Sequence, residues 1–477
     1  MHAGFGQWIG DSVRVPSRGL RRVATILVVL AVAAATGGAV ALSAPALVTD
    51  LGLVPPRPTA AAAERVPALG ALPVDAPLPT EAGLAAALDP LAKASGLGTF
   101  SGVVIDPASG RPLWQREPGR GLVPGSAAKL LTGAAALLTL SQTDRLVTRV
   151  VTGPEPGTVV LIGGGDPTLT AAPKGTDTVY PSPARLDDLA EQVRAAAPGP
   201  VQRVLVDTTR YTGPAIAPGW SSADITAGFV APIQPLMLDG GRTEAAVQDS
   251  PRTREPALAA GRALATLLGA DADDVAEVAA PAEAEVLGSV ASPMVSELVE
   301  HMTRTSDNVI AEVLAREVAL ARGGAPTFDG GVEQVLAALG QAGFDTTGAV
   351  LLDGSGLTRT ARVPAQLLGA ILAEAAAPVH GQESAPFLRP IVSGLPVAGG
   401  DGTLNERFAR ESPTAAGRGV VRAKTGTLSG ANSLAGVVTD ADGRLLVFAL
   451  MSNGASPVQA RPRLDAIASE LSRCGCT

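Results

Sequence analysis

Lysine is scarce in this 477-residue chain. Lysine and arginine together number 37, yet only four of these positions are lysine. Arginine stays protonated in proteins, whereas the amine of a buried lysine can lose its proton. The few lysines are therefore candidates for sites that need a titratable amine; they are Lys93, Lys129, Lys174 and Lys424.

Histidine and cysteine are scarcer still. The three histidines are His2, His301 and His380, and His2 lies in the N-terminal tail, which leaves at most two candidates for a Ser-His-Asp triad. No G-x-S-x-G motif accompanies them. The two cysteines, Cys474 and Cys476, are too few for a disulfide framework or a zinc site. They predict either a disulfide in the tail or two spare thiols.

Aromatic residues make up only 3% of the chain, while 46% is hydrophobic and Ala, Gly and Pro are frequent. This composition is typical of a globular protein packed through small residues, and the length allows two or three domains. The net charge is −8, and no run of basic residues follows the N-terminal tail. Nucleic acid is therefore excluded as an expected partner.

The N-terminal region predicts a membrane-directed segment. Residues 1–22 carry four arginines and are expected to form a cytoplasmic tail, and residues 23–48 are uncharged and mostly apolar. That length can span a bilayer as a transmembrane anchor, with the rest of the chain outside. A signal peptide cleaved near residues 41–44 is the alternative. Residues 49–78 are rich in Pro and Ala and predict a semi-stiff linker.

Ser126 and Lys129 form the most informative local pattern. They lie three residues apart after Pro124-Gly125, at the start of an apolar run over residues 130–140. A helix beginning at Ser126 would place both side chains on one face. A serine becomes a strong nucleophile when a neighbour accepts its proton, and a lysine with a lowered pKa can do so. The pattern predicts a nucleophile and its base, although it is too loose to do so alone.

Apolar periodicity divides the remaining chain into a main domain and an insert. Residues 146–285 predict an inserted domain, with a glycine-rich stretch at 163–165 that we interpret as a turn. The main domain is expected over residues 79–145 and 286–473. Its predicted helices are 80–94, 293–303, 306–322, 332–342, 364–376 and 458–471, and its predicted strands 99–105, 111–115, 350–352, 420–423, 433–439 and 445–451.

Three short motifs follow one another along the chain: Ser126-x-x-Lys129, Ser306-Asp307-Asn308 and Lys424-Thr425-Gly426. Alone, the second is typical of a helix N-cap and the third of a strand-edge turn. In this order they resemble the motifs of serine penicillin-binding proteins and β-lactamases. The 180 residues from Ser126 to Ser306 are similar to the spacing in class C low-molecular-mass penicillin-binding proteins, the D-alanyl-D-alanine carboxypeptidase/endopeptidase family. Further similar stretches are residues 161–169, 218–220, 353–357 and 395–404.

The resemblance implies an α+β fold over residues 80–455. It would comprise a transpeptidase-like domain, with an antiparallel sheet flanked by helices and a helical subdomain, interrupted by an inserted α/β domain. The insert is short compared with family members that carry two nested inserted domains. The implied location is the extracytoplasmic face of the cell membrane or, after secretion, the cell wall.

The resemblance also implies acyl transfer through Ser126, with Lys129 as its base. Ser306 and Lys424 would pass a proton to the leaving amine, and Asn308 would bind the substrate amide. The backbone N–H groups of Ser126 and Thr427 would bind the oxyanion. Thr425 and Thr427, on an edge strand beside Lys424, would bind the substrate carboxylate, and Gly426 would be a further substrate-binding residue. Neither a metal nor another cofactor is implied.

The implied partners are peptidoglycan stem peptides and, as covalent inhibitors, β-lactam antibiotics. Asp224 resembles a family acidic residue that meets the free amine of diaminopimelate, with a solvated loop position as the alternative. Cleavage of D-Ala-D-Ala termini and cleavage of D,D-cross-links both stay open. So do two other functions on the same scaffold, a β-lactamase or esterase and a non-catalytic cell-wall scaffold.

Overall fold

The computed structural model describes residues 76–378 and 387–476. The chain divides into two compact units, Met1–Ala71 and Leu72–Thr477, and every described residue belongs to the second. The expected cytoplasmic tail, the apolar segment 23–48, most of the 49–78 linker and His380 lie outside the described residues. Within the described ranges, no helix has the length and apolar character needed to cross a membrane.

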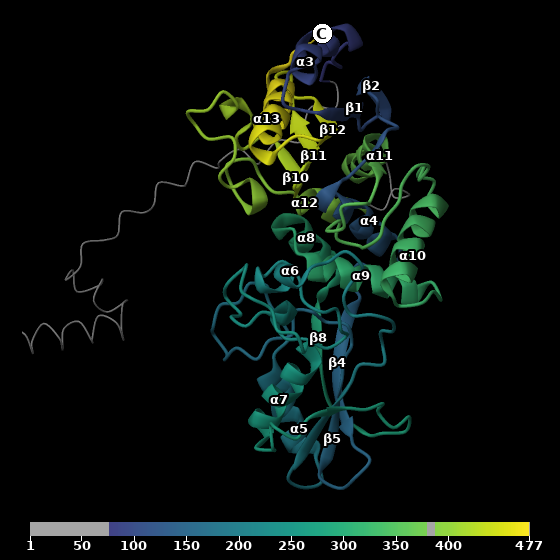
Figure 1. Ribbon diagram of the computed structural model, residues 1–477, viewed down its shortest axis with the longest axis vertical. Coiled ribbons are helices and arrows are strands. Elements are labelled where there is room, and N and C mark those ends of the chain that lie inside the picture. Colours follow the sequence, from purple (N-terminus) through teal and green to yellow (C-terminus); the bar gives the residue numbers. More distant parts are fainter. Residues whose placement is uncertain (1–75, 379–386, 477) are drawn as a thin grey trace, which may run out of the picture. The chain divides into compact units, whose positions relative to one another are not determined.

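A five-stranded antiparallel sheet forms the first layer of the main domain (Figure 1). Its order is β10-β11-β12-β1-β2, so strands from the two ends of the chain pair directly, as Val103 opposite Ala449. Five of the six strands predicted for the main domain are present, four with small changes at their ends, while β10 begins two residues later and ends five residues later than the predicted strand 420–423. They are β1 Thr99–Asp106, β2 Arg111–Arg116, β10 Arg422–Leu428, β11 Ala431–Thr439 and β12 Leu445–Asn453.

Helices cover both faces of this sheet because successive side chains of a strand point to opposite sides. On one face, Val104 packs in a cluster with α3 (Glu81–Ala92) and α13 (Pro457–Arg473). On the other face, the neighbouring Val103 packs in a cluster with α11 (Ala365–Ala376). The sheet is therefore buried on both sides. A two-stranded ladder of β3 (Gly121–Leu122) and β9 (Val363–Pro364) lies apart from it.

A helical subdomain packs beside the sheet around α4 and α9. Nine consecutive residues of α4, Lys129 to Leu137, are buried, and so are nearly all of α9. A helix that is buried around nearly its whole circumference belongs at the centre of a core. The subdomain contains α4 Lys129–Thr139, α8 Val295–Thr305, α9 Asn308–Ala321, α10 Phe328–Gln341 and α12 Arg389–Ser393.

The inserted segment forms its own mixed five-stranded sheet in the order β7-β6-β5-β4-β8 (Figure 1). Strands β5, β6 and β7 are parallel, whereas β4 pairs antiparallel with β5 and β8. Leu189 of α5 and Leu264 of α7 share a buried cluster with this sheet. The elements are β4 Arg145–Thr152, β5 Thr158–Ile162, α5 Leu186–Ala196, β6 Arg203–Asp207, α6 Ser222–Thr226, α7 Pro256–Leu268, β7 Ala276–Glu277 and β8 Val286–Met294.

The structure differs from the sequence-based expectations at two places. Strand β8 was assigned to the main domain, but it pairs with β4, so the sheet of the insert extends beyond residue 285 to Met294. The predicted strand 350–352 is reduced to a single bridge between Val350 and Arg362. Both errors concern pairing between strands, which local periodicity does not encode.

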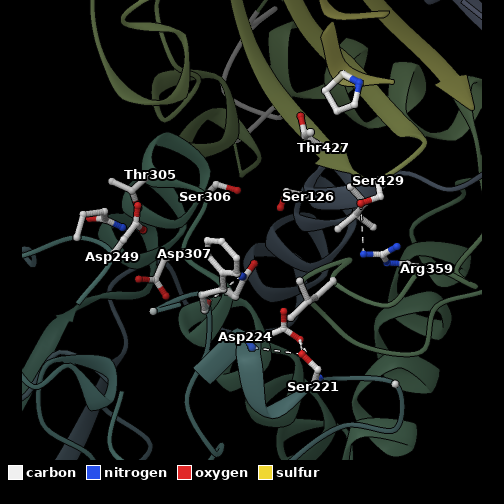
Figure 2. Close-up of a pocket in the computed structure, with 18 of the residues that line it drawn as sticks. Ser126, Ser221, Asp224, Asp249, Thr305, Ser306, Asp307, Arg359, Thr427 and Ser429 are labelled. Atoms are coloured by element: carbon white, nitrogen blue, oxygen red, sulfur yellow. Dashed lines mark hydrogen bonds between the residues drawn. The ribbon is translucent and has the colours of Figure 1, made fainter. Parts of the chain in front are cut away.

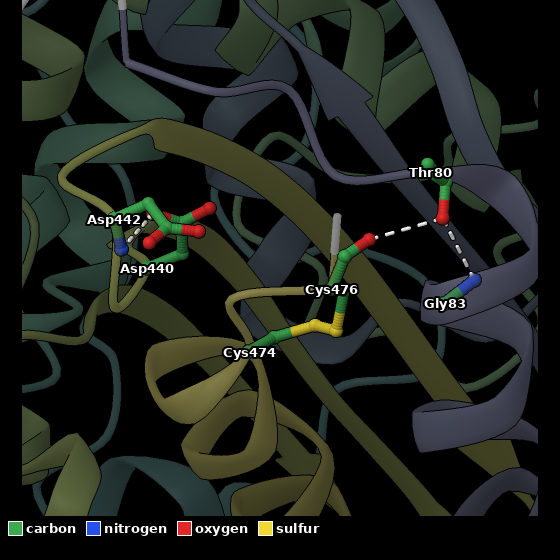
Figure 3. Close-up of a disulfide and its surroundings, with 6 residues drawn as sticks. All are labelled: Thr80, Gly83, Asp440, Asp442, Cys474 and Cys476. Carbon is green, nitrogen blue, oxygen red and sulfur yellow. Dashed lines mark hydrogen bonds between the residues drawn. A yellow bond between two sulfur atoms is a disulfide. The ribbon is translucent and has the colours of Figure 1, made fainter.

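The C-terminal cysteines form a disulfide, Cys474–Cys476, which is one of the two expected alternatives (Figure 3). The Cys476 carbonyl accepts hydrogen bonds from Thr80 N at 2.8 Å and from Thr80 Oγ1 at 3.0 Å. Thr80 is also the N-cap of α3, where its Oγ1 accepts from Gly83 N. The bridged tail is thus tied to the first turn of α3.

Candidate active site

Ser126 lies on a short 3-10 turn, Gly125–Ala128, and the α-helix α4 begins only at Lys129. The prediction that a regular α-helix begins at Ser126 is therefore wrong by about one turn. In a 3-10 turn, side chains three residues apart eclipse each other, so the pair still faces one way. Ser433 Oγ on β11 donates a 2.7 Å hydrogen bond to the Pro124 carbonyl and fixes the turn against the sheet.

Lys129 is buried and its amine has three polar neighbours. Its Nζ lies 3.0 Å from Ser126 Oγ, 2.6 Å from Asn308 Oδ1 and 2.8 Å from the Ser355 carbonyl oxygen. A neutral amine has two N–H groups and one lone pair. It can donate to Asn308 and Ser355 and at the same time accept the hydroxyl proton of Ser126.

Burial makes the amine of Lys129 easier to deprotonate. It lowers the pKa of Lys129 to about 8, against the opposing effect of three carboxylates, Glu312, Asp353 and Asp307. Lys424 is affected in the same direction, because burial, and then the charge of Lys129, hold the pKa of Lys424 well below its usual range.

Ser306 connects two helices in a left-handed conformation, with φ of +63°. Its Oγ accepts a 2.9 Å hydrogen bond from Lys424 Nζ, which also donates to the Thr425 carbonyl at 2.8 Å. Asp307 caps α9 by accepting from Ile310 N at 3.0 Å. The motif therefore combines the N-cap of α9, made by Asp307, with a contact to Lys424, made by Ser306.

Asn308 is the first residue of α9 and lines the pocket. Its Oδ1 accepts from Lys129, and its Nδ2 donates to the Phe229 carbonyl at 2.9 Å. Phe229 belongs to the inserted segment, so the side chain of Asn308 connects Lys129 to the insert.

The Lys424-Thr425-Gly426 motif lies on β10, an edge strand as expected. Thr427 lines the pocket, and its Oγ1 lies 3.3 Å from Arg461 Nε. Thr425 is buried and its Oγ1 donates to Thr403 Oγ1 at 2.8 Å. A Cβ at Gly426 would overlap Ser433 Oγ and the Pro124 carbonyl oxygen, so only glycine lets the strand lie this close to the Ser126 turn.

Ser126, Ser306, Asn308 and Thr427 line a pocket of about 740 Å³ (Figure 2), and Lys129 and Lys424 contact its lining through their hydrogen bonds to Ser126 and Ser306. Ser126, Ser306 and Thr427 lie toward the sheet and the helical subdomain, and Asp224 and Ser221 lie across the pocket from them. Asp224 accepts from Ser221 N at 2.8 Å and from Ser221 Oγ at 3.0 Å, forming the capping box of α6. Asp224 is therefore a helix cap that also faces the pocket.

Glu312, whose carboxylate holds the loop that contacts Lys129, was not identified from the sequence. Its carboxylate accepts from Gly354 N at 2.9 Å and Ser355 N at 2.8 Å, and so fixes the loop whose Ser355 carbonyl accepts from Lys129. Burial and the neighbouring Asp353 raise the pKa of Glu312 to about 7. Its position four residues after Asn308 on α9 was the available signal, because that spacing places both on one helix face.

The chain was also compared with known proteins. The model of the D-Ala-D-Ala carboxypeptidase 3 (S13) family matches residues 84–252 and 247–474. Carboxypeptidase DacB of Mycolicibacterium smegmatis is 46% identical over 427 residues, which cover 89% of this chain and 90% of that protein. A D-alanyl-D-alanine carboxypeptidase of an Actinomadura species is 31% identical over 445 residues, which cover 78% of this chain and 81% of that protein.

Among solved structures, penicillin binding protein 4 of Haemophilus influenzae superposes with a TM-score of 0.64 at 21% identity. The match covers 83% of this chain and all of that one, which confirms the predicted fold class. The sequence relatives extend the match from the fold to the family. This chain belongs to the D-Ala-D-Ala carboxypeptidase 3 (S13) family.

Proposed function

We propose that this protein is a serine D,D-peptidase that cleaves the D-Ala-D-Ala ends of peptidoglycan stem peptides through an acyl-enzyme on Ser126. The observation that supports this best is the pairing of two buried lysines with two serines at one pocket. Lys129 Nζ lies 3.0 Å from Ser126 Oγ, and Lys424 Nζ lies 2.9 Å from Ser306 Oγ. Such pairing suits acyl transfer without a metal.

In the first step, Ser126 Oγ attacks the carbonyl carbon of the scissile amide and its proton moves to Lys129 Nζ. The C–N bond of the tetrahedral intermediate then breaks, and the proton held by Lys129 is passed through Ser306 and Lys424 to the leaving amine, which leaves Lys129 neutral again. In the second step, water attacks the ester, its proton returns through Lys129, and Ser126 Oγ is released with its hydrogen. The proton count closes over the cycle.

The backbone N–H groups of Ser126 and Thr427 stabilise the oxyanion in this mechanism. Their closeness is favoured by Gly125, whose φ is +54° and whose Cβ, if present, would lie 3.0 Å from Thr427 N. Each donor aimed at a developing negative charge contributes roughly 3–4 kcal/mol to transition-state binding.

Substrate contacts follow from the residues around Ser126. Thr427, at the edge of β10, binds the carboxylate next to the scissile amide, and Asn308 binds the amide on the acyl side. Asp224, across the pocket from Ser126, offers a carboxylate to the amine of the stem-peptide side chain. A D,D-cross-link also places a carboxylate beside its scissile amide, so endopeptidase activity belongs to the same proposal.

The deciding experiment is mass spectrometry of the protein after penicillin treatment, with Ser126→Ala as the control. A lasting adduct on Ser126, together with D-alanine release from a stem-peptide mimic, is expected. An adduct that is hydrolysed within seconds, without D-alanine release, would indicate a β-lactamase instead. No adduct and no release from the wild-type protein would indicate a non-catalytic scaffold.

The pH dependence of acylation provides a second prediction. Lys129 must be neutral to accept a proton, so kcat/KM should rise with pH through the Lys129 pKa of about 8. Glu312→Gln removes a negative charge that favours the protonated amine, so the pKa of Lys129 falls and the rise of kcat/KM moves to lower pH. Glu317→Gln, on the same helix but bound to Arg210, is the matched control and should not move it. If kcat/KM of Glu312→Gln rose at the same pH as in the wild-type protein, or at a higher pH, this role of burial and charge would be contradicted.

We also propose that the protein acts outside the cytoplasmic membrane, held there by residues 23–48 or released after their cleavage. The apolar segment and the arginines before it support this location. Cell fractionation combined with N-terminal mass spectrometry tests it. An intact N-terminus in the membrane fraction supports an anchor, a start near residue 45 supports a signal peptide, and recovery in the cytosol would refute both.

A further inference from the structure

A buried ion pair joins the inserted segment to the Ser306-Asp307-Asn308 turn. Arg242 NH2 lies 3.1 Å from Asp307 Oδ2, and the two side chains are 0% and 1% exposed. Arg242 comes from the inserted segment, whereas Asp307 lies between the two motif residues that face the pocket. A charge pair without solvent contact must be compensated by protein groups alone.

Both carboxylate oxygens of Asp307 have assigned partners. Oδ1 accepts from Ile310 N of α9 at 3.0 Å, and Oδ2 accepts from Tyr180 Oη at 3.0 Å as well as from Arg242. Tyr180 also comes from the insert, and its ring lies 4.8 Å from the Arg242 guanidinium carbon. Thus one oxygen is bound by the helix that the turn begins, and the other only by the insert.

Arg242 is itself rigidly placed. Its Nε donates to the Gln248 carbonyl at 3.1 Å, and its NH1 donates to the Asp239 carbonyl at 2.9 Å. These backbone acceptors belong to the insert, so the guanidinium arrives at Asp307 already oriented. A bond made by a pre-oriented group loses little conformational entropy when it forms.

Ser306 needs such support because its φ of +63° is unfavourable for a residue with a side chain. This conformation persists only when the surrounding structure enforces it. It aims Ser306 Oγ at Lys424 Nζ, and the next residue but one, Asn308, contacts Lys129. Any rotation of the turn would therefore disturb both serine–lysine pairs.

We propose that Arg242 and Tyr180 are positioning residues for Ser306 and Asn308, acting through Asp307. The inserted segment is then required for the acylation step itself, in addition to any part in binding substrate. This inference rests on the proposed acyl-enzyme function. It deepens that function by assigning to the insert the orientation of two active-site side chains.

The charge of Arg242 also controls the pH at which Asp307 becomes protonated. Arg242 and Arg252 hold the pKa of Asp307 well below its usual range despite complete burial, so Asp307 stays ionised. Without Arg242, burial raises this pKa, and Asp307 becomes protonated as the pH falls. The titratable and charged groups that face Asp307 are Arg242, Arg252, His301, Tyr180 and Lys129.

The test measures acylation by a fluorescent penicillin, from mildly acidic to neutral pH, in the full-length protein. Arg242→Gln is expected to slow acylation by about 10- to 100-fold per folded molecule, and by more at acidic pH, with little change in initial binding. Tyr180→Phe removes only one hydroxyl and should slow acylation severalfold. Arg242→Gln combined with Asp307→Asn removes both charges of the ion pair and should recover much of the loss and abolish the added acid sensitivity.

Arg210→Gln is the matched control. Arg210 also comes from the insert and binds α9, through Glu317, at an Nε–Oε1 distance of 2.8 Å, but it lies far along the helix from the motif. It is expected to keep the acylation rate of its folded fraction. Thermal unfolding of each variant supplies the folded fraction.

Two outcomes would overturn the positioning role: wild-type acylation rates in both Arg242→Gln and Tyr180→Phe, or equal slowing in Arg210→Gln. If Arg242→Gln does not fold, Tyr180→Phe and the double variant decide the question. Absence of labelling in the wild-type protein would refute the proposed function and this inference with it. Labelled wild type with unimpaired variants would refute the inference alone.

Discussion

Replacing Lys129 with arginine is expected to slow acylation of Ser126 by about a hundredfold to ten-thousandfold, the usual contribution of a general base. The positive charge would be kept, but a guanidinium does not release its proton in proteins and so cannot accept the one from Ser126. The rate constant for labelling by a fluorescent penicillin measures this directly. Lys129 is one of only four lysines in the chain, and it is buried against Ser126, Asn308 and Ser355.

A substitution of Lys129 both removes the base and disturbs a buried site, so a second variant is needed to separate the two effects. Lys129→Met has a similar length without an amine and should lose as much activity as Lys129→Arg, because both lack a proton acceptor. Lys93→Arg is the control, since Lys93 is exposed and only pairs with Asp89 at 3.1 Å. Retention of more than a tenth of the wild-type rate by Lys129→Arg would contradict the role of Lys129 as base.

Gly426→Ala is expected to abolish most acylation although no reacting group is removed. The added Cβ would overlap Ser433 Oγ and the Pro124 carbonyl oxygen, which hydrogen-bond to each other and hold the Ser126 turn against the sheet. Strand β10 must therefore shift, and the Thr427 N–H moves away from the oxyanion position. Loss of one such donor costs about 10²- to 10³-fold in kcat, and overpacking of this kind costs about 1–3 kcal/mol of stability.

Gly340→Ala gives a matched comparison for this substitution. Gly340 lies in α10, and a Cβ there would meet no heavy atom within 4 Å. The change should leave acylation intact and raise stability by up to about 1 kcal/mol, because alanine favours a helix over glycine. Thermal unfolding and penicillin labelling of both variants test the pair. Wild-type labelling by Gly426→Ala would show that the approach of β10 to Ser126 is not needed.

The sequence predicted those features that depend on neighbours along the chain. Ser126 and Lys129 are three residues apart, so any tight turn or helix brings them together, and the structure places their polar atoms 3.0 Å apart. Alternation of apolar residues likewise predicted β1, β11 and β12 within a few positions of their observed ends.

Other features depended on segments that meet only after folding. The assignment of β8 to the sheet of the insert follows from its pairing with β4, about 140 positions away. Glu312 acts on Lys129 through the Ser355 carbonyl, a path that crosses three separate segments. The lowered pKa of Lys129 also required the structure, because it arises from burial of the amine among segments that are distant in the sequence.

By itself, the sequence determined the reactive pair, the order of the three motifs and most strands, because spacing along the chain sets which side chains share a face. The tertiary structure alone decided the protonation of Lys129, the contact of Arg242 with Asp307 and the extent of the insert's sheet. The physical reason is that burial and charge pairing depend on every segment packed around a group, and those segments are distant in the sequence.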